Sequence, residues 1–96
     1  MPYVLAFNRP AIEARIARLA GYLGFAGGFD GFQQAVLALR EALAVPHTVA
    51  GLNVDASRED LIAEMAIVDP TAGGNPVPLT KDAALTLFRN ALAGTL

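Results

Sequence analysis

Residues 69–80 read Asp-Pro-Thr-Ala-Gly-Gly-Asn-Pro-Val-Pro-Leu-Thr and lie between two stretches with helical periodicity. This segment contains one charged residue, two glycines and three prolines. Neither a helix interior nor a central strand accommodates such a run of prolines. The segment therefore predicts a shaped loop between two helices.

Helix-boundary signals flank the loop on both sides. On its amino side a helix ends at Asp69-Pro70, because proline disfavours helical geometry in the residue before it. Thr80 is placed to cap the next helix, and Gly94 to end it. The helix before the loop is preceded by Ser57-Arg-Glu-Asp60, a capping box with Asp in place of Glu or Gln. The apolar positions of these two helices are Leu61, Ile62, Met65 and Val68 in the first, and Ala84, Leu85, Phe88, Ala91 and Leu92 in the second. We expect Met65 and Phe88 to lie in the core.

Two earlier helices follow from the same 3.6-residue period. The first is expected to begin at Pro10, a residue favoured in a first helical turn, and to end at Gly21 and Gly24. The second is expected to begin with Asp30 as N-cap and to end before Pro46. Their apolar stripes are Ile12, Ile16, Leu19 and Leu23, and Phe32, Val36, Leu39 and Leu43.

The remaining segments are short. Residues 47–52 are compatible with one helical turn. Residues 1–8 are apolar on all sides, lack a helix-start signal and read as the end of an element that began earlier. Strand signals are nearly absent, so we predict a single all-α domain over residues 1–96, built as a small helical bundle.

The composition predicts an interface. Hydrophobic residues make up 54% of the 96-residue chain and charged residues 17%, against about 45–50% and about 25% in typical soluble domains. A few short helices cannot bury this excess, and large apolar patches mark interfaces. We therefore expect either a homo-oligomer or a piece of a larger protein.

Other classes are disfavoured. The net charge is −2 and the seven Lys and Arg residues are scattered, whereas nucleic-acid binding needs clustered cations. The longest apolar candidate, residues 19–29, is broken by four glycines, so we expect no membrane span. There is no secretory signal and no cysteine, which fits a cytoplasmic protein.

Three segments carry a resemblance to a known family. Met-Pro-Tyr-Val-Leu-Ala-Phe-Asn, residues 1–8, looks like a Leu-Pro-His-Val-Met-x-Phe/Tyr-Asn pattern. Residues 39–54 resemble a helix followed by Ile/Val-Pro, a Leu-rich turn and Gly-Val. Gly74-Asn75-Pro76 matches a Gly-Asn-Pro-Arg motif. Together they resemble the C-terminal helical region of iron-containing (group III) alcohol dehydrogenases, whose helical domain has a dehydroquinate synthase-like fold.

The resemblance implies an oxidoreductase that uses Fe²⁺ and NAD(P). It also implies that the metal ligands and the cofactor domain precede this part of the family, so no catalytic, metal-binding or cofactor-binding residue is assigned here. By position, Thr71, Gly73 and Gly74 would border the substrate pocket. Two departures are Tyr3, where His is common, and Val77, where Arg is common. The expected function is a C-terminal dehydrogenase fragment, inactive alone, whose partner is a second copy or the missing remainder of the enzyme.

Several residues could suggest a metal or phosphate site but are better explained by structural roles. His47 is a lone histidine and we assign it a surface or capping role, since metal sites need three or four ligands. Asp60 and Glu64 are expected on a solvated helix face, and Glu59 at the helix start. Gly73-Gly74 lacks the spacing and the preceding strand of a phosphate-binding loop.

Two alternative functions remain open. The first is a free-standing helical module for protein interaction. The second is a carrier protein with phosphopantetheine on Ser57, although Asp55-Ala56-Ser57-Arg58 breaks the Asp-Ser-Leu motif of that family.

Overall fold

The structure, a computed structural model, describes the whole chain from Met1 to Leu96. It contains helices and connections with no strand, so the predicted all-α class is confirmed. The four α-helices are α1 (Pro2–Tyr22), α2 (Gly28–Ala42), α3 (Glu59–Val68) and α4 (Lys81–Ala93). Three single turns of 3₁₀ helix lie between them, namely η1 (Ala50–Leu52), η2 (Ala56–Arg58) and η3 (Ala72–Gly74).

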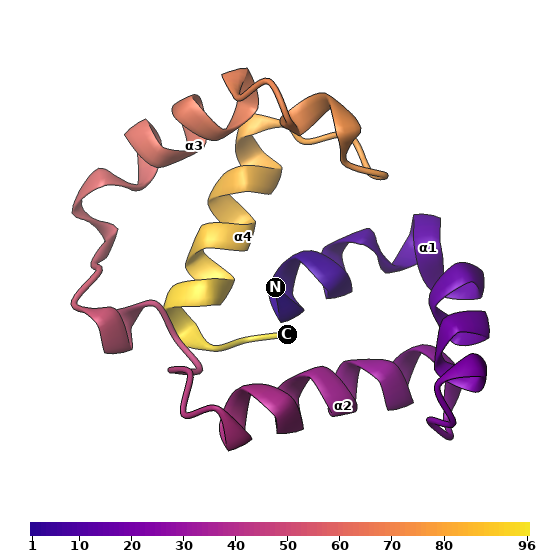
Figure 1. Cartoon of the computed structure of the whole chain (residues 1–96). Coiled ribbons are helices and arrows are strands. Elements are labelled where there is room, and N and C mark those ends of the chain that lie inside the picture. Colours follow the sequence, from indigo (N-terminus) through magenta and orange to yellow (C-terminus); the bar gives the residue numbers. More distant parts are fainter.

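The helices form two pairs, as Figure 1 shows. α1 packs mainly on α2, and α3 mainly on α4, while α1 and α4 make a smaller contact between the pairs. The connection from α2 to α3 carries η1 and η2, and the loop of residues 69–80 joins α3 to α4. The radius of gyration is 14.3 Å, compared with about 12.5 Å for a compact domain of this length. The two pairs therefore form an open arrangement.

Helix α1 starts eight residues earlier than the sequence predicts. Pro2 occupies its first turn, and Pro10 lies inside the helix, where it removes a backbone hydrogen bond and favours a kink. Figure 1 shows that α1 changes direction partway along its length. The helix continues through Pro10 because one side of its first two turns is buried, with Tyr3 at 8% and Asn8 at 5% exposed. Residues 2–8 therefore form the first turns of α1, with Met1 as the N-cap, and are not the end of an earlier element. The predicted end is confirmed, since α1 stops at Tyr22 and Gly24 adopts a positive φ of 78°.

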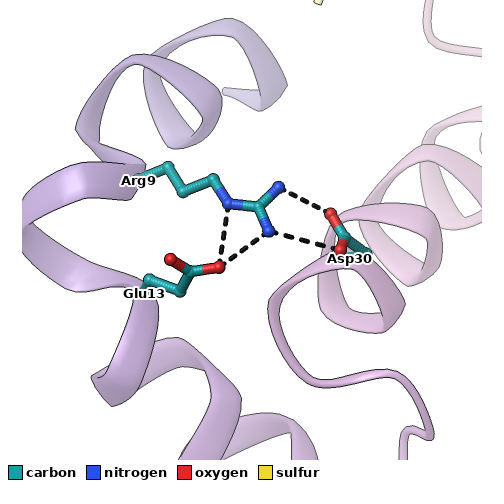
Figure 2. A network of polar contacts seen from close by, with 3 residues as sticks. All are labelled: Arg9, Glu13 and Asp30. Atoms are coloured by element: carbon teal, nitrogen blue, oxygen red, sulfur yellow. Dashed lines mark hydrogen bonds and ion pairs between the residues drawn. The ribbon is translucent and has the colours of Figure 1, made fainter.

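An arginine joins α1 to the start of α2, as Figure 2 shows. Arg9 donates hydrogen bonds to Glu13 Oε1 at 2.7 and 3.0 Å and to Asp30 Oδ1 at 2.7 Å. Its guanidinium carbon also lies 4.6 Å from the centre of the Phe29 ring. Phe29 is buried, so this exposed ionic network covers the apolar contact between the two helices.

The predicted N-cap of α2 is wrong. Gly27 is the N-cap, with a left-handed φ of 86°, and Asp30 lies within the first turn. A side chain at Gly31 would meet the Ala26 carbonyl oxygen at 1.7 Å. The loop before α2 therefore doubles back tightly on the helix, which needs glycines at both positions. Asp30 is consequently free to pair with Arg9.

The capping box predicted at Ser57 is also wrong. Asp55 is the cap, because its Oδ1 accepts a hydrogen bond from Ser57 N at 2.8 Å at the start of η2. Helix α3 then begins at Glu59 and ends at Val68, as predicted from Asp69-Pro70. On α4 both predicted boundaries are confirmed: Thr80 Oγ1 accepts from Ala83 N at 3.2 Å, and Gly94 has a φ of 80°.

Ion pairs connect α3 to α4 at two levels. Arg89 donates to both carboxylate oxygens of Glu59, at 2.6 and 2.9 Å. Lys81 donates to Glu64 at 2.8 Å and lies 3.6 Å from Asp60. Asp60 and Glu64 are exposed, as predicted, and they share one lysine.

Little of the chain is buried. Only nine of the 96 residues are buried, and Met65, predicted to lie in the core, is 63% exposed. The predicted apolar stripe of α3 is uncovered, since all four of its residues are exposed and the single buried residue of the helix is Ala63, which lies outside the stripe. Phe88 is half-buried. The apolar period thus located the helices correctly, but several of the faces that it defines have no partner within the chain. No helix combines the length and the apolar character needed to cross a membrane.

Candidate functional site: the loop of residues 69–80

The loop begins with a turn held by Asp69. The Asp69 carboxylate accepts hydrogen bonds from the Thr71 hydroxyl and, at 2.7 Å, from the Thr71 backbone N–H. These two hydrogen bonds favour the ionised form and lower the pKa of Asp69. The single turn of η3 follows, closed by Gly74 N donating to Thr71 O at 3.0 Å. The first half of the loop is therefore shaped by local hydrogen bonds.

The second half of the loop is fixed to α1. Asn8 and Asn75 each donate a side-chain hydrogen bond to the other's carbonyl oxygen, both at 2.8 Å. Asn8 Oδ1 also accepts from Val77 N at 3.3 Å, and Asn75 Nδ2 donates to Val77 O. These contacts join two of the three segments that carry the resemblance, residues 1–8 and Gly74-Asn75-Pro76.

The three predicted pocket residues lie at different places on this loop. Thr71 lines a hollow of about 330 Å³. Gly73 lines a second one of about 370 Å³, and Gly74 lines neither. Ala72, Asn75 and Leu79 line both hollows, which are therefore adjacent. The residues around the first hollow are Val4, Ala66, Asp69, Thr71, Ala72, Asn75, Leu79 and Leu87.

Gly73 and Gly74 face open space. A Cβ atom built at either glycine would have no other atom within 4 Å. Neither has a positive φ. Nothing in this chain therefore requires glycine at these two positions, and any close approach to their backbone would come from outside the chain.

The loop has few groups capable of chemistry. The Thr71 hydroxyl already donates to Asp69, and a carboxylate with a lowered pKa is a poor proton donor at neutral pH. No group of three or more His, Asp or Glu side chains is placed to hold a metal ion. The loop is suited to shaping a surface and offering hydrogen bonds to a neighbouring group.

His47 has the surface and capping role predicted for it. Its exposed ring donates from Nε2 to Gly94 O at 3.1 Å, at the carboxyl end of α4. Its own carbonyl accepts from the Tyr3 hydroxyl, and the two rings lie 5.9 Å apart. His47 thus connects the segment after α2 to both α1 and α4.

Two features of the structure were not predicted. One is the pairing of Asn8 with Asn75, for which the signal was present, because both residues belong to the matching segments. The other is Arg40, whose Nη1 atom is buried without a hydrogen-bond partner. No sequence pattern singles out that arginine among the others.

Comparison with known proteins finds sequence similarity between this chain and a dehydrogenase. The chain is 30% identical over 104 aligned positions to an NADPH-dependent butanol dehydrogenase from Clostridium saccharobutylicum. The alignment takes in 99% of this chain and 27% of that enzyme, so the chain spans about a quarter of the length of its curated relative. No protein-family model matches the chain, and no solved structure matches it. The chain is therefore a small helical domain, homologous to part of a butanol dehydrogenase.

Proposed function

We propose that this chain serves as the C-terminal helical part of an iron-dependent, NAD(P)-linked alcohol dehydrogenase. The observation that carries the proposal is the extent of the alignment, which includes nearly the whole chain but only 27% of the relative. A domain that is homologous to one quarter of an enzyme, and has no metal-holding group of its own, needs the remaining parts for chemistry. Fe²⁺ and the nicotinamide cofactor would be bound outside these 96 residues.

The exposed surface supports a role inside a larger assembly. The chain exposes 6234 Å², whereas a monomeric protein of 10.0 kDa exposes about 5,200 Å². The excess of about 1,000 Å² is comparable to the surface that one partner contributes to a specific interface. Many of the exposed residues are large and apolar, including Leu61, Met65 and Val68 of α3. Burial of this face against the rest of the enzyme, or against a second copy, would supply the core that the chain lacks.

Within that enzyme the loop of residues 69–80 would border the substrate pocket. Thr71 would lie nearest the substrate, and Gly73 and Gly74 would allow another backbone to approach, since no atom of this chain occupies the space beside them. These three residues would shape the pocket and orient the substrate. The chain alone, supplied with Fe²⁺ and NAD(P)⁺, is expected to oxidise no alcohol above a blank.

A chimeric enzyme tests this function. The stretch of the butanol dehydrogenase that aligns with this chain is replaced by residues 1–96, and NADPH-linked turnover of butanol is measured. We expect measurable activity, well above that of the same enzyme with the stretch deleted. A second chimera carries a Gly-Ser segment of equal length in place of residues 69–80, and we expect it to bind NADPH but to lose turnover of butanol.

The decisive result against the proposal is a first chimera that binds NADPH normally and shows no turnover. A free-standing interaction module is the alternative, and a stable, monodisperse monomer of the isolated chain would favour it. Sedimentation of the purified chain over a range of concentrations makes that distinction.

A further inference from the structure

Arg40, near the end of α2, carries a charge that no group in the chain neutralises. Its Nη2 atom donates to the backbone carbonyls of Pro46 and, at 3.2 Å, His47. Its Nη1 atom is buried and makes no hydrogen bond, and none of the five ion pairs of the chain includes Arg40. A buried donor without a partner is costly, more so when it is charged. The arrangement therefore favours an acceptor, preferably an anion.

Arg40 lines a hollow whose walls are mainly apolar. The hollow has a volume of about 430 Å³, within the range of small-molecule sites, about 300–1,000 Å³. It is bounded by the start of α1, the segment after α2 and one side of α4. Its apolar walls include Val4, Val45, Val49, Leu52, Leu87 and Phe88. No Asp or Glu lines it.

Arg40 is the only Lys or Arg residue that lines this hollow. An anion placed there would neutralise the charge of Arg40 and satisfy its free donor.

We propose that this hollow binds an aliphatic monocarboxylate, with the carboxylate on Arg40 and the hydrocarbon chain along the apolar walls. Binding requires a turn of the Arg40 side chain that presents Nη1 to the hollow. A small molecule is favoured over the carboxylate of a partner protein because the volume of about 430 Å³ is that of a small-molecule site. The inference rests on Arg40 and its surroundings and is independent of the proposed dehydrogenase function.

Titration of the isotope-labelled chain, followed by NMR, tests the site. The probe is hexanoate, compared with 1-hexanol and hexylammonium, which have the same hydrocarbon chain with a neutral or positive head group. We expect hexanoate alone to shift the amide signals of Val45, Thr48 and Leu87, which surround the hollow. Arg40→Gln should weaken hexanoate binding at least about tenfold, because a charge-assisted hydrogen bond is lost. The matched control is Arg18→Gln, which removes an exposed arginine without an ion pair and should leave the affinity unchanged.

A second variant keeps the test valid if Arg40→Gln fails to fold. Ala91→Leu leaves Arg40 in place and reduces the space in the hollow, so it should also weaken hexanoate binding. The proposal is overturned if hexanoate binds no better than hexanol, or if Arg40→Gln binds hexanoate as tightly as the unaltered chain. It is equally overturned if hexanoate has no effect and Arg40→Gln instead abolishes self-association, since the partner of Arg40 would then be a carboxylate of a second copy.

Discussion

Asn8 and Asn75 hold each other through a reciprocal pair of side-chain hydrogen bonds across 67 residues of chain. Asn8 belongs to α1 and Asn75 to the loop between α3 and α4, so the pair connects the two helix pairs of the fold (Figure 1). Asn8 is 5% exposed. Because water has little access to Asn8, its amide must find partners within the protein.

Replacement of Asn8 by alanine should loosen the whole loop. The change leaves the Asn75 amide and the Val77 N–H without their partner, which costs about 1–3 kcal/mol of unfolding free energy. A loss of 1 kcal/mol lowers Tm by about 4–8 °C in a domain of this size. We also expect faster hydrogen exchange at the amides of residues 74–77. Gln34→Ala, which truncates an exposed amide on α2, is the control and should change neither quantity.

A double-mutant cycle of Asn8→Ala and Asn75→Ala separates the pair from its surroundings. Residues in direct contact show coupling energies of about 0.5–3 kcal/mol. Strictly additive effects of the two substitutions on the free energy of unfolding, measured by chemical denaturation, would mean that the Asn8–Asn75 pair does not stabilise the fold.

Gly31 and Gly21 should respond in opposite ways to alanine. A Cβ at Gly31 would lie 1.7 Å from the Ala26 carbonyl oxygen, whereas one at Gly21 meets no atom within 4 Å. Gly31→Ala therefore forces the loop before α2 to move and should destabilise the chain by several kcal/mol or prevent folding. Gly21→Ala lies in the last turn of α1 and should stabilise it by about 0.5–1 kcal/mol. Thermal unfolding followed by circular dichroism measures both, and a similar Tm for the two variants would contradict the tight turn at Ala26.

Replacement of Ala44 by glycine should stabilise the chain. Ala44 follows α2 and has a φ of 53°, in the left-handed region. This conformation costs an alanine roughly 1–2 kcal/mol of conformational energy. Ala44→Gly removes this strain at the position where helices favour glycine. After the extra entropy of glycine in the unfolded chain, we expect a net gain of about 0.5–1 kcal/mol. Ala38→Gly, in the middle of α2, is the matched control and should destabilise by about 1 kcal/mol.

The sequence predicted helix ends better than helix starts, and the reasons differ by residue. Asp69-Pro70 and Gly94 stop helices through local backbone chemistry, which depends on no distant contact. The start at Pro2 depended on the burial of Tyr3 and Asn8 against other parts of the fold, and this outweighed the usual tendency of Pro10 to begin a helix. Asp30 was misassigned as a cap because its partner, Arg9, lies 21 residues away.

The predicted core failed for a different reason. Period-3.6 spacing identifies an apolar face without showing what covers it. Met65 shares the helical face of its apolar neighbours and is 63% exposed. The only buried residue of α3 is Ala63, and ion pairs with Lys81 and Arg89 join the helix to α4. The candidate site was found by resemblance alone, because Thr71, Gly73 and Gly74 form no charged or nucleophilic cluster that periodicity or spacing could reveal.

The acid side of the stability profile should depend on Glu59. Hydrogen bonds from Arg89, and then the charge of Arg89, lower the pKa of Glu59 below its ordinary value of 4.5. A carboxyl group whose pKa is lower in the folded state stabilises the fold above the pKa of the unfolded state. This contribution is lost as the pH falls from about 4.5 through the lowered pKa of the folded chain. The pKa values of Asp55 and Asp69 are also lowered, by hydrogen bonds from the side chains and then the backbone N–H groups of Ser57 and Thr71, and act in the same direction.

The variant Glu59→Gln isolates this effect. Its unfolding free energy should lie below that of the unaltered chain at pH 6, and the difference should shrink as the pH falls from about 4.5 through the lowered pKa of Glu59. High salt should reduce the difference at pH 6, since the pair with Arg89 is exposed to screening. Glu41→Gln, which removes a carboxylate outside the five ion pairs, provides the reference curve. Urea denaturation between pH 3 and pH 7 gives both profiles, and a Glu59→Gln curve parallel to that of the unaltered chain would show that the Glu59–Arg89 pair does not stabilise the contact between α3 and α4.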